Sequence, residues 1–429
     1  MGITLGITVL FVVFFVLLML NVPISFAIIV SSLVGMLASG FDGLAIIQRL
    51  QASAESGPLL AIPFFVIAGI IMDRGGVTKL MIDFAFSIVG HIRGGLALVN
   101  VMGGMLMGGI SGSSVADTAS IGSVMIPAMK QKKYDIGFTT ALTASSGTIG
   151  AMIPPSIPMV ILGITANVSI GGLFLAGIVP GIVLGLVMMV YAYYVSKKHN
   201  YPTEVRVSSG EVLRRLINAI LPLLTVVIII VGVVGGVFTA TEAGAVACIY
   251  ALFLGMFVYK KISWKDIPNI FKEGCLISAA VMLIVVASSA FGYVLTYAHV
   301  PDNLVQLLLG ITENKYFLLF LINVFLLILG TFLDPTPIIL LVAPILYPIV
   351  IAMGVDPIQF GTMFVLNMAI GNLTPPVGVV LFTAAGLAKI SVESVLKPMI
   401  PLWIIMIGIL LLVTYVPAFS LFIPKIFMS

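Results

Sequence analysis

Residues 367–376 read NMAIGNLTPP and interrupt a long apolar segment of the chain. The Pro-Pro pair removes two backbone N–H donors and prevents a continuous helix, so the carbonyl groups before it lose their helical partners. Inside a bilayer such a break is tolerated only where it is buried in protein or lines a cavity. A second break, SGTIGAMIPP, occupies residues 146–155. One broken segment in each half of an apolar chain is the best sequence indicator of a transporter binding site.

The composition indicates a polytopic membrane protein. Of the 429 residues, 61% are hydrophobic and 8% are charged, whereas a soluble domain averages roughly 25% charged residues. The apolar runs continue for about 16–25 residues without period-two alternation, which is typical of membrane-spanning helices and not of a β-barrel. The first twenty residues lack a basic region and a small-residue cleavage site, so we expect a retained span.

Several function classes are not supported by the sequence. No Gly-x-x-x-x-Gly-Lys-Ser/Thr run occurs, so we expect no ATP hydrolysis by this chain. The net charge of +4 comes from basic loops and does not predict a nucleic-acid partner. The three histidines lack metal-ligand spacing, and none is placed for Ser-His-Asp catalysis, so we expect no enzymatic activity. Cys248 and Cys275 are predicted to be small buried hydrophobic residues.

The chain is predicted to be all-α and to consist of two repeats. The two breaks lie 221 residues apart, and the same offset relates Gly109 to Gly330 and Asp135 to Asp356. Chance matches among common residues are the alternative. The first repeat spans 1–195, with scaffold spans in 1–90, a re-entrant hairpin at 94–129, a broken helix at 136–167 and a span at 172–195. The second spans 216–429, with scaffold spans in 216–312, a hairpin at 316–353, a broken helix at 358–388 and a last span at 395–420.

Loop charges predict how the halves are oriented. Cytoplasmic loops carry an excess of Lys and Arg, and the connector 196–215 and the loop 260–273 are both basic. The loop 41–56 carries one base and two acids and is predicted to lie outside as an amphipathic surface helix. The repeats are therefore predicted to have inverted topology, with both termini periplasmic. Short arm helices are expected near 77–90 and 302–312.

Each predicted hairpin has a polar centre with one acidic residue. Asp117 is the only charge in 94–129, and Asp334 is the only charge in 316–353. An ionisable residue inside the membrane is by default a functional candidate. Beside the carbonyl groups freed by Pro335 and Pro337, the carboxylate of Asp334 suits a hard cation such as Na⁺; a structural capping role is the alternative. For Asp117 we expect capping of the returning half-helix.

Half-helix ends at the tips and breaks also present bare N–H groups, which attract anions. One site built from four broken elements can therefore hold an organic anion together with Na⁺. Glu242 is expected to cap the N-terminus of a span. The candidate polar donors to the substrate are Ser111, Ser113, Ser114, Ser145, Ser146, Asn367 and Asn372. For any one serine, helix–helix packing is the alternative role.

At these residues the sequence resembles the large membrane subunit of TRAP transporters, the tripartite ATP-independent periplasmic family. The matching motifs are GISGS at 109–113, ADT at 116–118, IPPS at 153–156, TEA at 241–243, LDPTP at 333–337 and GNLTPPVG at 371–378. The resemblance covers essentially the whole chain, and the last motif is quite specific. It implies an elevator-type secondary transporter of the bacterial inner membrane, in which a scaffold holds a moving core.

The resemblance also implies particular sites. The first Na⁺ site would use Gly108, Ser111, Gly150, Ile153 and Pro155, and the second would use Thr331, Asp334, Gly371, Thr374 and Pro376. The substrate would lie between the tips, where Asp334 joins the candidate donors Ser113, Ser114, Ser145, Ser146, Asn367 and Asn372.

Two partners are implied as well: a soluble periplasmic substrate-binding protein and a small membrane subunit of about four helices. Because this chain starts at its first core span, we expect the small subunit to be a separate chain.

The function expected from the sequence is Na⁺-coupled import of an organic acid of the C4-dicarboxylate or sialic-acid class. A stand-alone Na⁺/dicarboxylate symporter that needs no binding protein is the alternative within the same fold family. An ion channel is a third possibility, but it has no use for paired Pro-Pro breaks.

Overall fold

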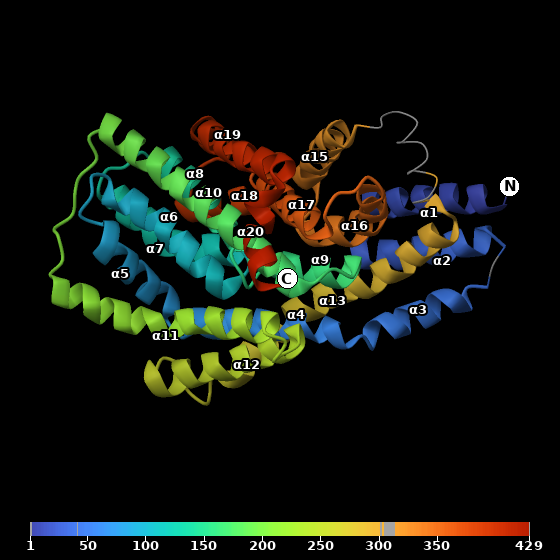
Figure 1. The fold of residues 1–429 in the computed structure, drawn as a ribbon, viewed down its shortest axis with the longest axis horizontal. Coiled ribbons are helices and arrows are strands. Elements are labelled where there is room, and N and C mark those ends of the chain that lie inside the picture. Colours follow the sequence, from blue (N-terminus) through green and yellow to red (C-terminus); the bar gives the residue numbers. More distant parts are fainter. Residues whose placement is uncertain (1, 41, 301–302, 304–313, 429) are drawn as a thin grey trace.

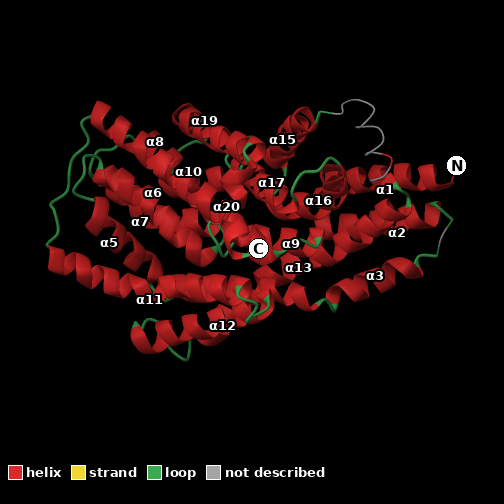
Figure 2. Cartoon of the chain, in the orientation of Figure 1, coloured by secondary structure: helices red, strands yellow, loops and turns green. Residues whose placement is uncertain are grey.

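A computed structural model describes residues 2–40, 42–300, 303 and 314–428. In this part of the chain every regular element is a helix (Figure 2). Eight helices among the described residues are long and apolar enough to cross a membrane. The all-α multi-pass architecture expected from the composition is therefore confirmed. The predicted arm helix at 302–312 lies almost entirely outside the described residues.

The first half of the chain folds into α1 (Gly2–Met19), α2 (Ile24–Ala38), α3 (Leu44–Ala54), the 3₁₀ turn η1 (Gly57–Leu60), α4 (Ala61–Arg74), α5 (Val77–Val89), α6 (Gly95–Ser111), α7 (Ser114–Gln131), α8 (Ile136–Thr148), the 3₁₀ turn η2 (Ile149–Ala151), α9 (Ile157–Ala166) and α10 (Ile170–Lys198). Helices α6 and α7 occupy the range predicted as the first hairpin. Helices α8 and α9 flank the first Pro-Pro break.

The second half folds into α11 (Ser209–Val234), α12 (Ala240–Phe253), the π-helical turn η3 (Leu254–Val258), α13 (Ile267–Tyr297), α15 (Lys315–Phe332), α16 (Pro335–Ala352), α17 (Pro357–Gly371), α18 (Val379–Ala388), α19 (Glu393–Tyr415) and α20 (Pro417–Phe427). Helices α15 and α16 occupy the range of the second hairpin, and α17 and α18 flank the second break. The inverted orientation of the two halves and the side on which the termini lie stay predictions.

The helices form two groups (Figure 1). The outer group comprises α1–α4 and α11–α13, which pack on one another in the pairs α1–α2, α2–α13, α3–α13, α4–α13, α4–α12 and α11–α12. The central group comprises α6–α10 and α15–α20 and surrounds the two breaks. Helix α5 packs between the groups, against α6 and α11. Leu10, Phe14, Ile28 and Phe291 form a small hydrophobic core of their own within the outer group.

The helices that lead into the breaks lie at the centre of the molecule. Every residue of α8 from Gly137 to Thr148 is buried, and so is every residue of α17 from Gln359 to Gly371. Both helices begin at an aspartate whose carboxylate accepts backbone hydrogen bonds, Asp135 from Phe138 N and Asp356 from Ile358 N and Gln359 N. A helix that is buried all round requires neighbours on every side, which the remaining helices of the central group supply.

Capping explains three further residues. Thr239 and Glu242 form a reciprocal capping box at the start of α12, so the role expected for Glu242 is confirmed. At the start of α7 the cap is the Ser113 hydroxyl, which accepts a hydrogen bond from Ala116 N. The capping role expected for Asp117 is therefore wrong, because Ser113 already occupies the cap position.

The sequence also misplaced one cysteine. Cys248 is buried, as expected, but Cys275 is exposed on α13. The apolar composition of a long helix shows that it is surrounded by non-aqueous material, but it does not show which face contacts other helices.

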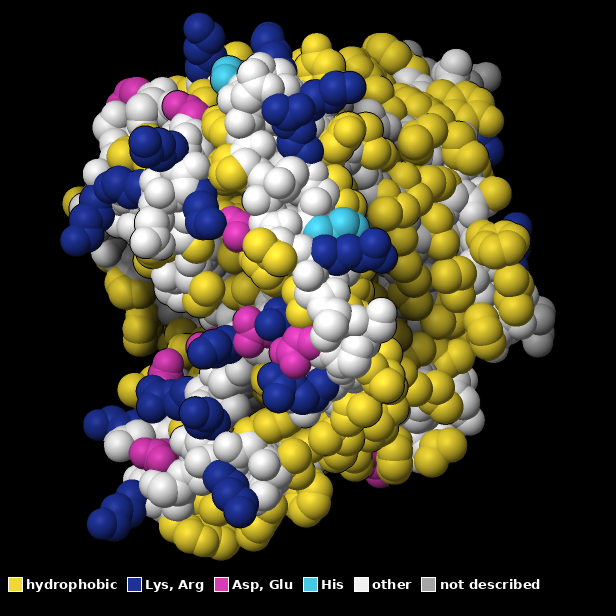
Figure 3. All heavy atoms as spheres, turned by 90° about the vertical axis from the view of Figure 1, so that its left-hand side faces the viewer, with side chains coloured by type: hydrophobic (Ala, Val, Ile, Leu, Met, Phe, Trp, Pro, Cys, Tyr) yellow, Lys and Arg dark blue, Asp and Glu magenta, His cyan; other side chains and the backbone are white. Residues whose placement is uncertain are grey.

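Basic side chains gather on the end of the molecule that lies at the left in Figure 1 (Figure 3). The connector between α10 and α11 runs over this end. It is held there by a salt bridge of 2.7 Å between Lys132 and Glu204 and by the Tyr201 ring, which stacks on Tyr134 with centroids 4.1 Å apart. The connector backbone also bonds the α5–α6 turn, because Glu204 N donates to Gly90 O at 3.3 Å.

Candidate functional site

Each hairpin tip is hydrogen-bonded to the break in its own half. In the first half, Ile157 N donates to Gly112 O at 3.2 Å. In the second half, Val377 N donates to Thr331 O at 3.0 Å. The Pro-Pro bonds at both breaks are cis. The structure thus brings each tip, at residues 111–114 and 331–335, against the broken helix that follows it in the sequence.

Two glycine pairs allow this close approach. A Cβ on Gly108 would lie 2.6 Å from Gly150 Cα, and a Cβ on Gly371 would lie 2.5 Å from Gly330 Cα. Backbone atoms that meet this closely leave room for glycine only. In the contact pattern Gly330 corresponds to Gly108 and not to Gly109, so the sequence match between Gly109 and Gly330 is one residue out of register in the hairpins.

The residues predicted for the first cation site lie together. Gly108 touches Gly150. Ser111 lies in the tip, one residue before Gly112, whose carbonyl accepts the hydrogen bond from the break. A Cβ on Gly109 would lie 3.7 Å from Ile153 Cγ2, and a Cβ on Gly112 would collide with the Pro155 carbonyl oxygen.

Asp117 joins this cluster, although the sequence analysis did not place it there. Ser111 Oγ donates to Asp117 Oδ1 at 2.5 Å, and a side chain on Gly150 would collide with Asp117 Oδ2. The carboxyl group is fully buried, and Oδ2 has no hydrogen-bond partner among the described residues. An unpaired buried carboxylate oxygen is costly unless a cation or donor meets it. The donor set of carboxylate, hydroxyl and carbonyl oxygens fits a hard cation. The sequence did contain one indication of this role, because Asp117 is the only charged residue in 94–129.

The residues predicted for the second cation site divide into two places. Thr331, Gly371 and Thr374 lie around the second break: Thr374 N donates to Gly371 O at 2.9 Å, and the Thr331 carbonyl accepts from the segment after Pro376. Their hydroxyls are turned back into their own helices, since Thr331 Oγ1 donates to Ile328 O and Thr374 Oγ1 to Ile370 O. Backbone carbonyls are therefore the oxygens that this break presents.

Asp334 stands at the first position before α16 but makes no side-chain capping bond. The structural alternative for this residue, a capping carboxylate, is therefore not supported. Instead Asp334 is exposed and lines a cavity of about 220 Å³. The lining side chains come from the two tips, the two breaks and the outer-group helices α4 and α13.

Of the predicted substrate contacts, Ser113, Ser114, Asp334 and Asn372 line this cavity. The sequence analysis missed the other lining residues, which are Val66, Gly112, Val115, Ala151, Ile157, Pro158, Ile277, Val281, Pro335, Thr336, Val365, Met368 and Ala369. Three of these, Val66, Ile277 and Val281, come from outer-group helices whose apolar sequence carries no local signal of a site. Pro335 and Thr336 lie in the LDPTP motif quoted for its aspartate.

Four of the predicted polar donors to the substrate do not line the cavity. One is Ser111, whose hydroxyl donates to Asp117; the other three contact neighbouring helices. Ser146 Oγ donates to Asn100 Oδ1 at 3.1 Å, Ser145 Oγ contacts Met399 Sδ at 3.3 Å, and Asn367 Nδ2 donates to Asn323 Oδ1 at 2.7 Å. All three side chains are fully buried between helices. We therefore leave them out of the substrate contacts proposed below.

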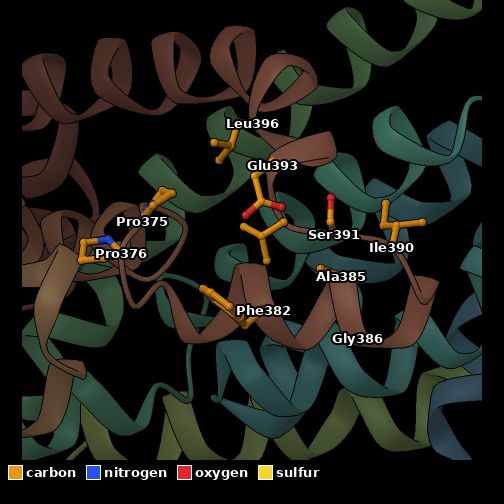
Figure 4. Close-up of a pocket in the computed structure, with 10 residues that line it drawn as sticks. Pro375, Pro376, Phe382, Ala385, Gly386, Ile390, Ser391, Glu393 and Leu396 are labelled. Atoms are coloured by element: carbon orange, nitrogen blue, oxygen red, sulfur yellow. The ribbon is translucent and has the colours of Figure 1, made fainter.

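A larger cavity of about 580 Å³ opens between α18 and α19 (Figure 4). Pro375 and Pro376 lie at one end of it, and Ser391 and Glu393 line it further along. The second break therefore adjoins a second cavity, which shares no lining residue with the cavity at the tips.

Comparison with known proteins gives a match to a family model described as "Tripartite ATP-independent periplasmic transporter, DctM component" over residues 11–419. The sialic acid TRAP transporter large permease protein SiaM of Vibrio cholerae is 39% identical, over 96% of this chain and 97% of the relative. The C4-dicarboxylate TRAP transporter large permease protein DctM of Pseudomonas aeruginosa is 39% identical, over 88% of each. The isethionate TRAP transporter permease protein DctMQ of Oleidesulfovibrio alaskensis is 40% identical, over 96% of this chain and 66% of the relative.

Among solved structures, the YdaH transporter of Alcanivorax borkumensis superposes with a TM-score of 0.62 over 87% of each chain. The sequence identity is 14%, so this similarity concerns the fold alone.

Proposed function

Because this chain belongs to the DctM component family of tripartite ATP-independent periplasmic transporters, we propose that it imports an organic acid across the bacterial inner membrane, coupled to Na⁺. The family resemblance stated from the sequence motifs is thereby confirmed. The observation that carries the proposal is the cavity at which both hairpin tips and both breaks meet.

The cavity and the relatives both support a substrate class. Ser113, Ser114 and Asn372 offer hydroxyl and amide donors, and α7 begins at the tip, so its N-terminal N–H groups favour an anion. The relatives are named for sialic acid, a C4-dicarboxylate and isethionate, and each of these compounds is an organic acid. We propose a substrate of the sialic-acid or C4-dicarboxylate class, held between the tips.

Na⁺ is proposed as the coupling ion because each half offers oxygens near the substrate. The first site would use Ser111 and Asp117 with carbonyl oxygens at Gly108, Gly150, Ile153 and Pro155. The second would use carbonyl oxygens at Thr331, Gly371, Thr374 and Pro376, and the Asp334 carboxylate would supply the nearby negative charge. A cation at these places offsets the repulsion between a carboxylate of the protein and the incoming anion.

Transport is proposed to proceed by movement of the central group against the outer group. The cavity lies on the boundary between them, since α4 and α13 form one wall and the tips form the other. Movement along this boundary would carry substrate and ions from one side of the membrane to the other. The proposed partners are a periplasmic binding protein that delivers the substrate and a small membrane subunit; the family description, tripartite and periplasmic, supports both.

Uptake into proteoliposomes tests the proposal. We expect radiolabelled N-acetylneuraminate or succinate to accumulate only when an inward Na⁺ gradient, the small subunit and a matching binding protein are all present. Asp334→Ala should abolish this uptake while the thermal unfolding curve stays that of a folded protein. Uptake without Na⁺ would exclude Na⁺ as the coupling ion. Full activity of Asp334→Ala would show that Asp334 does not belong to the transport site.

The same assay separates the alternative of a stand-alone symporter. Na⁺-dependent uptake that is equally fast without the binding protein would favour that alternative over the tripartite system.

A further inference from the structure

A second polar cavity lies near the cavity at the tips, and three helices line both. It has a volume of about 380 Å³ and is enclosed by α3, α9, α13 and α16. Helices α9, α13 and α16 also line the cavity at the tips. On α13 the first cavity is lined by Val281 and the second by Ser288, seven residues further along. At 1.5 Å rise per residue the two are about 10 Å apart.

Two hydroxyl groups in this second cavity lack partners. Ser288 is 3% exposed, and its Oγ has no hydrogen-bond partner among the described residues. Thr165 Oγ1, from the end of α9, is likewise buried without a described partner. Buried hydroxyls are hydrogen-bonded in most proteins, and leaving them unpaired is costly. Two hydroxyls on different helices of one cavity, both without described partners, indicate a site for a polar ligand.

Arg49 indicates the sign of the charge on that ligand. Its guanidinium lies over the Tyr293 ring, 4.7 Å from the centroid, and no carboxylate pairs with it in the described part of the chain. Stacking on a ring leaves the in-plane N–H groups free, and their fork matches a carboxylate. None of the described residues that line the cavity is acidic. Arginine and hydroxyl donors without an acid fit an anion and not a cation.

The place of the cavity connects it to transport. Helix α13 begins beside the basic loop at 260–265 and runs away from it, and Ser288 lies in its far half. By the loop charges that far half faces the periplasm. Arg49 and Ser288 both belong to the outer group, which does not move in the proposed mechanism.

We propose that this cavity, the Arg49 site, is a second binding site for the carboxylate group of the transported organic acid, occupied before the acid reaches the tips. The inference rests on the proposed function. Because the Arg49 site belongs mainly to the outer group, it binds the carboxylate on the periplasmic side and releases it as the tips move away. The acid is thereby bound more tightly on the side from which it is collected.

Protection of an introduced thiol tests the site without measuring transport. Ser53 lines the cavity, so Ser53→Cys is made in a Cys275→Ser background, with Cys248 left in place because it is buried. The purified protein is labelled with a maleimide in Na⁺-free buffer. We expect succinate or N-acetylneuraminate to slow labelling, and Arg49→Gln to raise the concentration required about tenfold, as loss of one charge-assisted hydrogen bond predicts. Arg49→Lys should recover part of the protection.

Three results would overturn the inference. They are no protection by either acid, protection that Arg49→Gln leaves unchanged, and equal protection by the neutral diamide of succinate. Protection by inorganic phosphate but by neither acid would assign the cavity to a phosphate group, such as a lipid head, and would also overturn it.

An uptake arm connects the site to transport. Arg49→Gln should raise the half-saturating external acid concentration about tenfold without changing the Na⁺ dependence, whereas Lys79→Gln, an exposed cation on α5, should change neither. Equal half-saturating concentrations for Arg49→Gln and the unaltered protein would contradict the inference. If the unaltered protein accumulates no acid at all, the proposed function fails, yet the thiol assay still reports on the Arg49 site.

Discussion

At the scale of single residues, the two breaks depend on glycines that touch backbone. A Cβ on Gly371 would lie 2.5 to 2.8 Å from three backbone atoms of Gly330. Backbone atoms cannot rotate away as a side chain can, so Gly371→Ala must separate the end of α15 from the second break. Overpacking of this kind typically costs about 1–3 kcal/mol. We expect a lower unfolding temperature in detergent and loss of Na⁺-dependent uptake.

Gly408→Ala on α19 is the matched control, because apart from its own stretch of helix no described residue has an atom within 4 Å of the added Cβ. It should leave stability and uptake unchanged. If Gly371→Ala behaved like Gly408→Ala, the contact between Gly330 and Gly371 would not shape the second ion site.

Asp117 gives the second prediction at this scale. Its carboxylate contributes one oxygen to Ser111 and leaves the other, Oδ2, facing Gly150. Asp117→Asn keeps the size of the side chain and removes the charge. We expect the Na⁺ concentration for half-maximal uptake to rise by about tenfold or more, since a charged ligand contributes more than a neutral one. Asp356→Asn serves as the control, because asparagine caps α17 as well as aspartate does. An unchanged Na⁺ dependence would remove Asp117 from the site.

Asp117 also shows where residue-level reasoning from sequence reaches its limit. A carboxylate just after a hairpin tip fits two roles equally well in the sequence: it can cap the helix, or it can bind a cation. The two roles differ by one turn of helix, and the structure decides because Ser113 already caps α7. The roles of the glycines and of the Pro-Pro pairs were easier to predict, because these residue types themselves determine which backbone conformations are allowed.

At the scale of helices, buried polar residues hold α8 and α17 in place. Ser146 on α8 bonds Asn100 on α6, and Asn367 on α17 bonds Asn323 on α15. Interhelical hydrogen bonds of this type replace the hydrophobic driving force that lipid does not supply. Both polar residues lie on the helix leading to the break, in the same relative position of each half.

The Ser146 bond and the Ser113 cap give a matched pair of variants. Ser146→Ala loses one interhelical hydrogen bond and Ser113→Ala loses one cap, and each loss costs about 1 kcal/mol. The two variants should therefore unfold at similarly lowered temperatures. Only Ser113→Ala should also raise the half-saturating substrate concentration, because only Ser113 lines the cavity. A raised half-saturating concentration in Ser146→Ala would return Ser146 to the substrate site.

Helix positions were largely predictable because each end is marked in the sequence. Asp135 and Asp356 begin α8 and α17, and the Pro-Pro pairs stop them. The sequence could not show which side of each helix faces the cavity. Ser145, Ser146 and Asn367 are polar residues beside a break, as Ser113 and Asn372 are, yet they turn toward neighbouring helices. Which face of a helix meets the cavity is decided by tertiary packing, and a helix that is buried all round carries no hydrophobic periodicity to reveal it.

At the scale of the whole molecule, the connector joins the central group to the outer group. The part of the connector next to α10 is held at the base of the first hairpin, by Tyr201 stacking on Tyr134 and by the salt bridge from Glu204 to Lys132. Helix α11, in the outer group, begins at Ser209. Residues 205–208 are therefore the length of chain that must absorb any displacement between the groups.

Deleting residues 205–207 tests whether that displacement occurs. Three residues in extended conformation span about 10 Å, so their loss removes most of the free length while Glu204, Lys132 and Tyr201 are retained. We expect uptake to be lost, because the central group can no longer move against α11. Equilibrium binding of the acid, measured with the purified protein in Na⁺ buffer, should persist in whichever state the shortened connector permits.

The matched control is an insertion of Gly-Ser-Gly after Arg206, which lengthens the same segment and should leave uptake near normal because loop extension costs little. If the deletion retained full uptake, the two groups would not move apart at this end of the molecule. Transport would then have to occur by rearrangement within the tips alone. If both deletion and insertion abolished uptake, the connector would serve as a rigid spacer and would not take up a displacement between the groups. Loss in the deletion alone supports movement of one group of helices past the other, with residues 205–208 taking up the displacement.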